Sequence, residues 1–533
     1  MNKKSIITFL LALVAVTGRA IDEYQFHSGT AVLRGRILNK PAGKWDNLSV
    51  VAFNLFTDEE QVHAIPVAAD GSFEASIHLP HSQSVLVRDI ANVFLAVGDT
   101  LELTKDAAQV EDEAGVTFGG HGASTDINRL WPELKRHYFG DRTLYTKGMP
   151  MEDATAWKQE MVRLMDAIHA DIEADRLPLG AQSSRLPAGT SAYVKEVLGA
   201  SLIAMPFYAT IENYCDNLFM KGGVMKDYYD FLTSREEWLL DNPAMLFVID
   251  KPDYFINSFA FYVMPDIGFM AGRFRLSCWN DEPDDVIVYK QEMLLPREFD
   301  ADLHRRLLSL RADTLLTCAD YYPAAMQATQ ERYGLRNVDF IQQMVLCRDV
   351  FDDVLPDKDF TPDHAVAKLA AAFPLISNPI VAHHALERYR QYVISEKGKA
   401  EITVSATPEA DAIFQRIIEP YKGNALSVHF WGMGCGPCRR EMLEEREKVE
   451  RLKDQPVRFL YICDEKDSPR ERSEPWLTQN NIKGEHIYLT HNEWNLLSAK
   501  FNIYAIPFNI GVDKDGNIVT YDAVNNYVQD LQK

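Results

Sequence analysis

Two cysteines in the C-terminal part of the chain stand at the start of a predicted helix. Cys435-Gly436-Pro437-Cys438 follows a predicted strand, 425–431, and a Gly432-Met433-Gly434 turn, and it opens a helix that continues through 439–445. Cysteines at positions i and i+3 of a first helical turn are close enough to form a disulfide. Pro437 suits this turn because its missing N–H would have no helical partner. The spacing therefore predicts a dithiol that can open and close.

The position of Cys435 favours a thiolate. Unpaired backbone N–H groups and the positive end of the helix dipole lower the pKa of such a cysteine from ~8.5 toward ~7. We expect Cys435 to attack a disulfide and Cys438, one turn later on the inner face, to resolve the mixed disulfide. CxxC pairs also bind zinc, but no second pair or suitably spaced histidines follow, so neither a metal nor a cofactor is expected.

The segments around the dithiol alternate between strand and helix patterns. Strands are predicted at 457–462 and 486–489, helices around 475–479 and at 493–501, and a hairpin at 508–519. The order is βαβ followed by αββ, which predicts an α/β module. A charged, glycine-containing break precedes this module, with the linker placed at 397–406 and the module at 407–533.

Phe430-Trp431-Gly432-Met433-Gly434 leading into the cysteines, with Ile506-Pro507 and Val512–Gly516 downstream, resembles the thioredoxin superfamily, specifically its exported TlpA/ResA-like branch. The resemblance covers roughly the last quarter of the chain. It implies a thioredoxin fold in which Pro507 is cis and faces the cysteines. It also implies that the Ile506 backbone binds an extended substrate segment as an added strand.

Three residues near the motif have two interpretations each. Glu441 matches a glutamate that is implicated in tuning the cysteines of TlpA/ResA-like proteins, and it could equally be a carboxylate that complements the helix dipole. His429 stands where thioredoxin has an aspartate and could accept a proton from Cys438 or simply be a hydrogen-bonded strand histidine. Cys463 could be a third redox thiol or a plain buried cysteine. Gly434 replaces the usual tryptophan, which widens the entrance.

The N-terminus has the pattern of a secretory signal peptide. Met1-Asn2-Lys3-Lys4 precedes an apolar run, 6–16, and small residues up to Ala20, so residues 1–20 are predicted to be cleaved. The run is too short to span a bilayer, although an N-terminal anchor is the alternative. We expect a periplasmic protein without stable membrane insertion.

The region between the leader and the redox module has two patterns. Short alternating runs with turn residues predict a β-sandwich over 21–119, and Gly119–Gly122 is interpreted as a hinge rather than a phosphate loop. Helical periodicity then predicts a mainly helical region over 120–396, with Asp126 as the cap of its first helix. The predicted fold class is thus multidomain. Further helices are expected at 192–204, 303–322, 338–350 and 380–393.

Composition limits the functions that this chain can have. The sequence has 55 Lys+Arg against 77 Asp+Glu, a net charge of −22, which excludes generic nucleic-acid binding. Seven cysteines are too few for a disulfide scaffold of 533 residues. The middle-region thiols, which stand far apart and lack zinc-site spacing, are Cys215, Cys278, Cys318 and Cys347.

The sequence therefore predicts an exported thiol:disulfide oxidoreductase that reduces protein disulfides. Gly-Pro between the cysteines resembles the reducing thioredoxins, and the resemblance implies recharging by a membrane electron donor. One alternative is an oxidase or isomerase of the same fold, because direction depends on the reduction potential. Others are an envelope binding protein with an accessory redox module and a copper-handling protein that uses both thiolates with His429.

Overall fold

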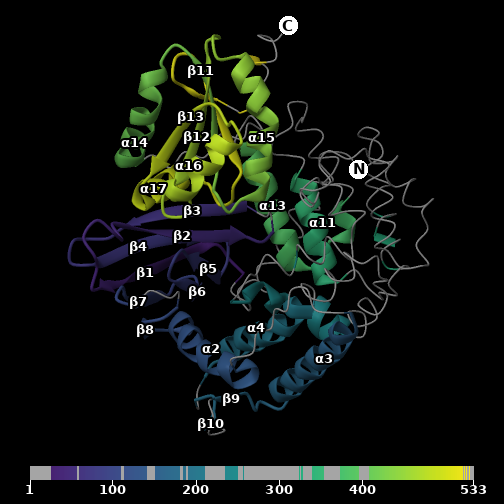
Figure 1. Ribbon diagram of the computed structural model, residues 1–533. Coiled ribbons are helices and arrows are strands. Elements are labelled where there is room, and N and C mark those ends of the chain that lie inside the picture. Colours follow the sequence, from purple (N-terminus) through teal and green to yellow (C-terminus); the bar gives the residue numbers. More distant parts are fainter. Residues whose placement is uncertain are drawn as a thin grey trace.

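The computed structural model shows several sheets and helical layers (Figure 1). It describes residues 26–56, 59–109, 113–140, 151–179, 184–187, 190–210, 235–249, 339–352, 372–394 and 407–519, together with positions 256, 323, 326, 327, 330, 521, 524, 527 and 528. The predicted signal peptide, the helix expected at 303–322 and the linker at 397–406 lie outside the described residues.

Eight strands of the N-terminal part form two four-stranded sheets. The first has the order β4-β1-β7-β8, and the second has the order β3-β2-β5-β6. The strands of the first sheet are β1 (Gly29–Leu38), β4 (Ser72–Leu79), β7 (Thr100–Asp106) and β8 (Val116–His121). Those of the second are β2 (Asn47–Asn54), β3 (Glu59–Pro66), β5 (Gln83–Val87) and β6 (Ala91–Leu95).

The two sheets bury apolar side chains in one common cluster. Leu33 and Leu103 of the first sheet and Val50 and Val85 of the second all belong to it. In the first sheet, β1, β4 and β7 carry buried residues separated by accessible ones, as strands with one covered face do. Strand β2 is different, since nearly all of its residues are buried, so the second sheet is covered on both faces.

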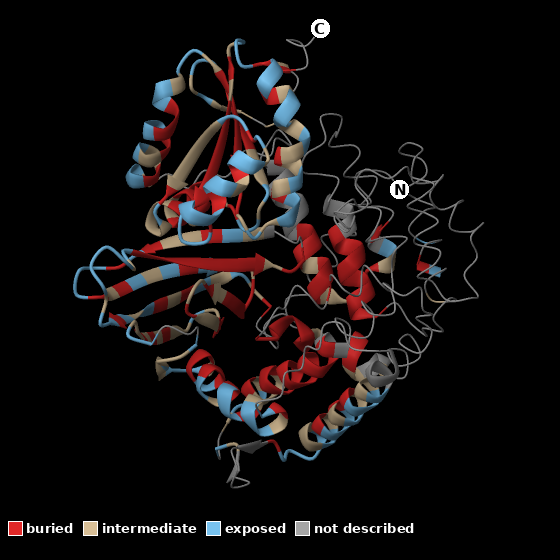
Figure 2. Cartoon of the chain, viewed as in Figure 1, coloured by how far each residue is buried: buried red, intermediate tan, exposed pale blue. Residues whose placement is uncertain are grey.

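Helices cover the other face of the second sheet. Val51 of β2 and Phe94 of β6 share a large cluster with the helical region. Helix α4 is buried along almost its whole length (Figure 2), as expected for a helix that is apolar on all sides. The helices of this region are α2 (Ala123–Phe139), α3 (Met151–Glu173), α4 (Ala192–Thr210), α11 (Phe340–Asp352) and α13 (Pro379–Ile394). Short elements accompany them: β9 (Pro178–Leu179), β10 (Ser184–Arg185), η2 (Glu236–Leu240), η3 (Pro243–Phe247) and η5 (Phe373–Leu375).

The start of α2 differs from the prediction. Gly122 is the N-cap and Asp126 lies inside the first turn, so the assignment of Asp126 as the cap is wrong. Asp99, at the end of a neighbouring turn, instead accepts hydrogen bonds from the backbone N–H and the hydroxyl of Ser124. Gly119 and Gly120 lie within β8, so the predicted boundary after Gly119 falls inside a strand.

The C-terminal module, residues 407–519, contains a five-stranded sheet with the order β13-β12-β11-β14-β15. Strands β11, β12 and β13 are parallel, and β14 and β15 are antiparallel to their neighbours. Helices α14 and α17 share one cluster with the sheet, and α15 and α16 share another, so both faces are covered. The strands are β11 (Ala425–Phe430), β12 (Val457–Asp464), β13 (Glu485–Leu489), β14 (Phe508–Val512) and β15 (Ile518–Val519), and the helices are α14 (Pro408–Ile418), α15 (Gly436–Arg451), α16 (Arg470–Gln479) and α17 (His491–Phe501). One further turn of 3₁₀ helix, η6, spans Glu419–Tyr421.

Helix α14 was not predicted from the sequence. Thr407 caps it by accepting a hydrogen bond from the Ala410 N–H, Pro408 occupies its first turn, and Glu409 and Asp411 complement its dipole. This Thr-Pro-Glu start is a recognisable helix signal.

The C-terminal module rests on the second N-terminal sheet. Helix α17 lies over β2 and β3 (Figure 1). At its C-terminal end, Asn502 adopts a left-handed conformation. Its side-chain amide accepts a hydrogen bond from the Val62 N–H at 2.8 Å and donates one to the Glu60 carbonyl. The two parts of the chain are therefore joined by specific polar contacts.

Candidate active site

Cys435 and Cys438 are joined by a disulfide at the N-terminus of α15. Cys435 is the N-cap residue, and its Sγ lies 3.1 Å from the Cys438 backbone N–H, which donates to it. Cys438 is 1% exposed, whereas Cys435 is partly accessible. Only the first sulfur can therefore be reached readily by another molecule.

The peptide bond between Ile506 and Pro507 is cis, and this segment faces the disulfide. The Ile506 carbonyl oxygen lies 3.6 Å from the Cys435 Sγ. The structure thus brings Cys435, Cys438 and the Ile506–Pro507 bond into one site. A peptide backbone next to an accessible sulfur can position an extended partner for exchange at that sulfur.

Glu441 lies on α15, one turn beyond Cys438. It belongs to a polar layer within the module that also contains Asn509, His429 and Glu445. Asn509 of β14 donates a hydrogen bond to the Glu441 carboxylate at 2.8 Å. Burial raises the pKa of Glu441, and the nearby Glu445 raises it further. The carboxylate therefore takes a proton more readily than a surface glutamate does.

His429 is buried on β11 beneath α15. Its Nε2 lies 3.1 Å from the Ser427 hydroxyl and 3.2 Å from the Glu445 carboxylate, while its Nδ1 lies 3.7 Å from Glu441. Burial lowers the pKa of His429, although Glu445 acts in the opposite direction. These contacts favour the interpretation of His429 as a strand histidine tied to the polar layer.

The rim of the site is formed by the turn before the cysteines and by the segment after β12. The Met433 N–H donates to the Ser468 hydroxyl at 2.8 Å, which ties the two segments together. The space around Gly434 is open, since a side chain there would meet nothing within 4 Å. This agrees with the wide entrance expected from the glycine at that position.

Two cysteines in the described part of the chain lie outside the disulfide, and both are buried. They are Cys347 of α11 and Cys463 of β12. Burial raises the pKa of the Cys463 thiol to about 12, and the adjacent Asp464 adds to this shift. Cys463 is therefore a poor nucleophile in the folded protein, as a plain buried cysteine would be. The predicted thiols at 215, 278 and 318 lie outside the described residues.

Sequence reasoning missed several polar residues at this site. Asn509 follows Pro507 by only two positions, so its place in the sequence could have marked it as a residue near the site. Ser468 and Glu445 had no such signal, because their contacts with Met433 and His429 depend on how β12 and α15 pack against β11.

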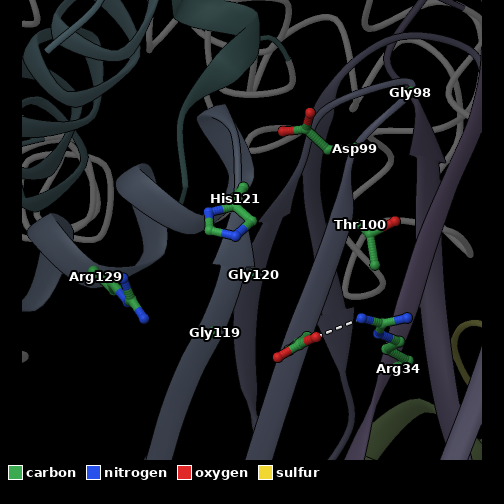
Figure 3. Close-up of a pocket in the computed structure, with 9 residues that line it drawn as sticks. Arg34, Gly98, Asp99, Thr100, Gly119, Gly120, His121 and Arg129 are labelled. Carbon is green, nitrogen blue, oxygen red and sulfur yellow. Dashed lines mark hydrogen bonds and ion pairs between the residues drawn. The ribbon is translucent and has the colours of Figure 1, made fainter.

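A hollow away from the disulfide lies at the edge of the first N-terminal sheet, next to the start of α2 (Figure 3). Its charged groups already have partners. Arg34 pairs with Glu102 at 2.5 Å, Asp99 caps α2, and the Arg129 Nε–H donates to the Phe118 carbonyl. We assign no ligand to this hollow, which is lined by Arg34, Gly98, Asp99, Thr100, Glu102, Gly119, Gly120, His121 and Arg129.

The described residues contain neither a metal-binding cluster nor a membrane-spanning helix. Within these residues, no three His, Cys, Asp or Glu side chains gather in a way that could hold a metal ion. In the same part of the chain, no helix combines the length and the apolar character needed to cross a bilayer.

Neither a protein-family model nor a curated protein matches the sequence. Solved structures similar to part of the chain are thioredoxin-like thiol-disulfide proteins. The thioredoxin domain of a thiol-disulfide oxidoreductase from Bacteroides vulgatus is 22% identical, with a TM-score of 0.19, over 21% of this chain and 84% of that one. A thiol:disulfide interchange protein from Chlorobium tepidum is 19% identical, with a TM-score of 0.18, over 21% and 82% of the two chains. StoA from Bacillus subtilis is 17% identical, with a TM-score of 0.18, over 20% and 85%.

Proposed function

We propose that this protein is an exported thiol:disulfide oxidoreductase that reduces protein disulfides through Cys435 and Cys438. One observation carries the proposal: the partly accessible Cys435 sulfur stands at the N-terminus of α15 and 3.6 Å from the Ile506 carbonyl, beside the cis bond to Pro507. A reactive sulfur and a backbone binding segment are the two parts that protein-disulfide exchange requires.

The reaction begins from the reduced dithiol. The Cys435 thiolate attacks one sulfur of the substrate disulfide, which forms a mixed disulfide and releases the other substrate sulfur as a thiolate that takes up a proton. The Cys438 thiol then loses its proton and attacks the Cys435 sulfur, which releases the second substrate thiol and closes the Cys435–Cys438 disulfide. A donor dithiol must supply two electrons and two protons before the next cycle.

The helix N-terminus supports the first step. Cys435 already accepts the Cys438 N–H, and a thiolate at this position gains from that hydrogen bond and from the helix dipole. The buried Cys438 is shielded from solvent, which favours its use as the internal resolving thiol. Glu441, in the polar layer one turn further along α15, is the residue that we propose tunes the pair.

The wider organisation belongs to the same proposal. Residues 1–20 are a signal peptide, 21–119 a β-sandwich, 120–396 a mainly helical region and 407–533 a TlpA/ResA-like thioredoxin fold. The parallel β11–β13 strands and the helix that follows β11 with Cys435 as its N-cap support the last assignment. The protein acts in the periplasm on protein disulfides and receives its electrons from a membrane donor.

The experiment that tests this function is insulin reduction by the mature protein with dithiothreitol as the electron source. The wild-type protein should accelerate precipitation of the insulin B chain, and the Cys435→Ser variant should not. A wild-type rate equal to that of dithiothreitol alone would overturn the proposal.

Equilibration of the disulfide with glutathione distinguishes a reductase from an oxidase. A potential near about −270 mV is typical of a reductant and one near about −120 mV of an oxidant. We expect the lower value. A value close to the upper one would favour the oxidase alternative, with the same residues in the same roles.

A further inference from the structure

A short turn of the N-terminal domain contacts the C-terminal module beside its active site. Residues Arg88, Asp89 and Ile90 connect β5 to β6. Asp89 has a φ of 61°, a conformation that Asp tolerates better than most residues do. From this turn, the side chains of Arg88 and Asp89 extend to the C-terminal module.

Arg88 holds the segment that leads into the cis proline. Its Nη2 donates hydrogen bonds to the carbonyl oxygens of Ile503 and Tyr504, each at 3.1 Å. Tyr504 is also placed by its ring, which packs edge-on against Phe53 of β2 with the ring centroids 5.4 Å apart. Only Ala505 separates this anchored pair from Ile506, whose carbonyl faces Cys435.

Asp89 holds the segment on the other side of the site. Its carboxylate pairs with Lys466 at 2.5 Å and with the Nε2 of His491 at 2.8 Å. The Nδ1 of the same imidazole lies 2.6 Å from Asp464. Asp89 therefore contacts Lys466 in the short stretch that follows β12 directly, and it contacts Asp464 at the end of β12 through His491.

That stretch is joined by a hydrogen bond to the turn before the cysteines. The Ser468 N–H donates to the Asp464 carbonyl at 2.8 Å, and the Ser468 hydroxyl accepts from the Met433 N–H. Met433 is two residues before Cys435. The Arg88–Asp89 turn thus contacts the segment before Ile506 directly and is connected to the turn before the cysteines through the stretch after β12, although it lies more than 300 residues away in the sequence.

We propose that Arg88 is a positioning residue for protein-disulfide substrates, because it fixes the 503–506 segment in the conformation that binds a substrate backbone, while Asp89 fixes the opposite rim. This inference rests on the function proposed above. An anchored segment needs no further ordering when the substrate binds, whereas a loose one must be ordered at a cost in binding free energy. Arg88 therefore contributes to substrate binding and leaves the thiol chemistry unchanged.

The test compares Arg88→Met with wild type in the full mature protein and uses two disulfide substrates. One is a polypeptide that can bind the 503–506 backbone, and the other is a small molecule that has no peptide backbone. The first substrate is insulin, and the second is the small aromatic disulfide DTNB. The KM for insulin should rise by about fivefold in Arg88→Met, because substrate binding must then order the segment, at a cost similar to that of fixing the backbone of about one residue. The rate with DTNB and the kcat with insulin should stay within about twofold, because neither depends on the anchored segment.

Two further variants complete the comparison. Arg36→Met is the matched control, since Arg36 lies on β1 of the same domain and pairs with the exposed Asp70 at 2.6 Å. It should behave as wild type. Arg88→Lys keeps a charged donor group that can still reach the 503–504 carbonyls in part, so it should give an intermediate KM for insulin. This variant keeps the inference testable if the methionine variant folds poorly. An unchanged insulin KM in the Arg88 variants, or equal losses with insulin and DTNB, would overturn the inference.

Hydrogen exchange separates this inference from the function on which it rests. Peptides that cover 503–506 should exchange faster in Arg88→Met than in wild type or Arg36→Met. Absence of insulin reduction by the wild-type protein would remove the proposed function, yet the exchange result would still decide whether Arg88 anchors the segment. Equal exchange in all three proteins would show that it does not.

Discussion

The imidazole of His491 lies 2.8 Å from the carboxylate of Asp89, a residue 402 positions earlier in the chain. Burial lowers the pKa of His491, but its hydrogen bonds to Asp464 and Asp89 outweigh burial and raise the pKa to about 9. With a carboxylate at each ring nitrogen, both nitrogens act as donors, which is the protonated form. A charged histidine thus joins the N-terminal sheet to the C-terminal module at neutral pH.

This charge makes the stability of the protein depend on pH. The pKa is raised from 6.5 to about 9 on folding, so the stabilisation is fully present below about pH 6.5 and is lost as the pH rises through about 9. The melting temperature of wild type should exceed that of His491→Asn most at pH 6, and the difference should shrink toward pH 9.5. The control is His78→Asn, at an exposed position on β4. A difference that stays constant over this range would contradict the prediction.

Replacement of Cys438 by Ser should trap the reaction half-way. Cys435 remains able to attack a substrate disulfide, but the internal thiol that releases the product is missing. We expect a covalent adduct with insulin chains on non-reducing gels that disappears with dithiothreitol, and a turnover rate reduced by about 100-fold or more. Cys435→Ser should form no adduct, because Cys438 is buried. Equal adducts in both variants would show that the roles of the cysteines are not distinct.

Glu441→Gln should make the folded protein more stable at neutral pH. Because the pKa of Glu441 is raised above 4.5 in the folded state, the folded state binds this proton more tightly than the unfolded state does. The stability of wild type then falls as the pH rises past 4.5, and the glutamine variant avoids that loss. Urea unfolding at pH 4 and pH 7.5 should show the variant gaining on wild type at the higher pH only. Glu444→Gln, at a neighbouring exposed position, serves as the control, and an equal gain there would rule out an effect specific to the half-buried Glu441 carboxyl.

Cys463 should be inert in the folded protein. With its pKa raised to about 12, the thiol is almost entirely protonated at pH 8. After brief reduction and treatment with iodoacetamide, peptide mapping should find Cys435 alkylated and Cys463 unmodified, unless the protein is first unfolded. Cys463→Ala should keep insulin turnover within about twofold of wild type. Rapid alkylation of Cys463 would revive its interpretation as a third redox thiol.

Local patterns predicted the parts of the site that depend on neighbours in the sequence. Cys435 and Cys438 are three residues apart, and β11 and β12 are mostly apolar, as strands that are buried along nearly their whole length are. The assignment of Asp126 as the cap of α2 was wrong, because the carboxylate that accepts the Ser124 N–H in the first turn is that of Asp99, which lies in another turn. The contacts of Arg88 and Asp89 with the C-terminal module could not be predicted, since they depend on how the second N-terminal sheet packs against that module. Nothing in the local sequence around Arg88 and Asp89 indicates that this turn contacts another module.

Asn502 has a consequence for the N-terminal sheet that is separate from redox chemistry. Strand β3 is outermost in its sheet, so the backbone groups on its free side would be open to pairing with another polypeptide. The amide of Asn502 offers one acceptor to Val62 and one donor to Glu60, the same complement that a neighbouring strand would offer. At these two residues the C-terminal module ends the sheet, so their backbone groups are not available to pair with another polypeptide.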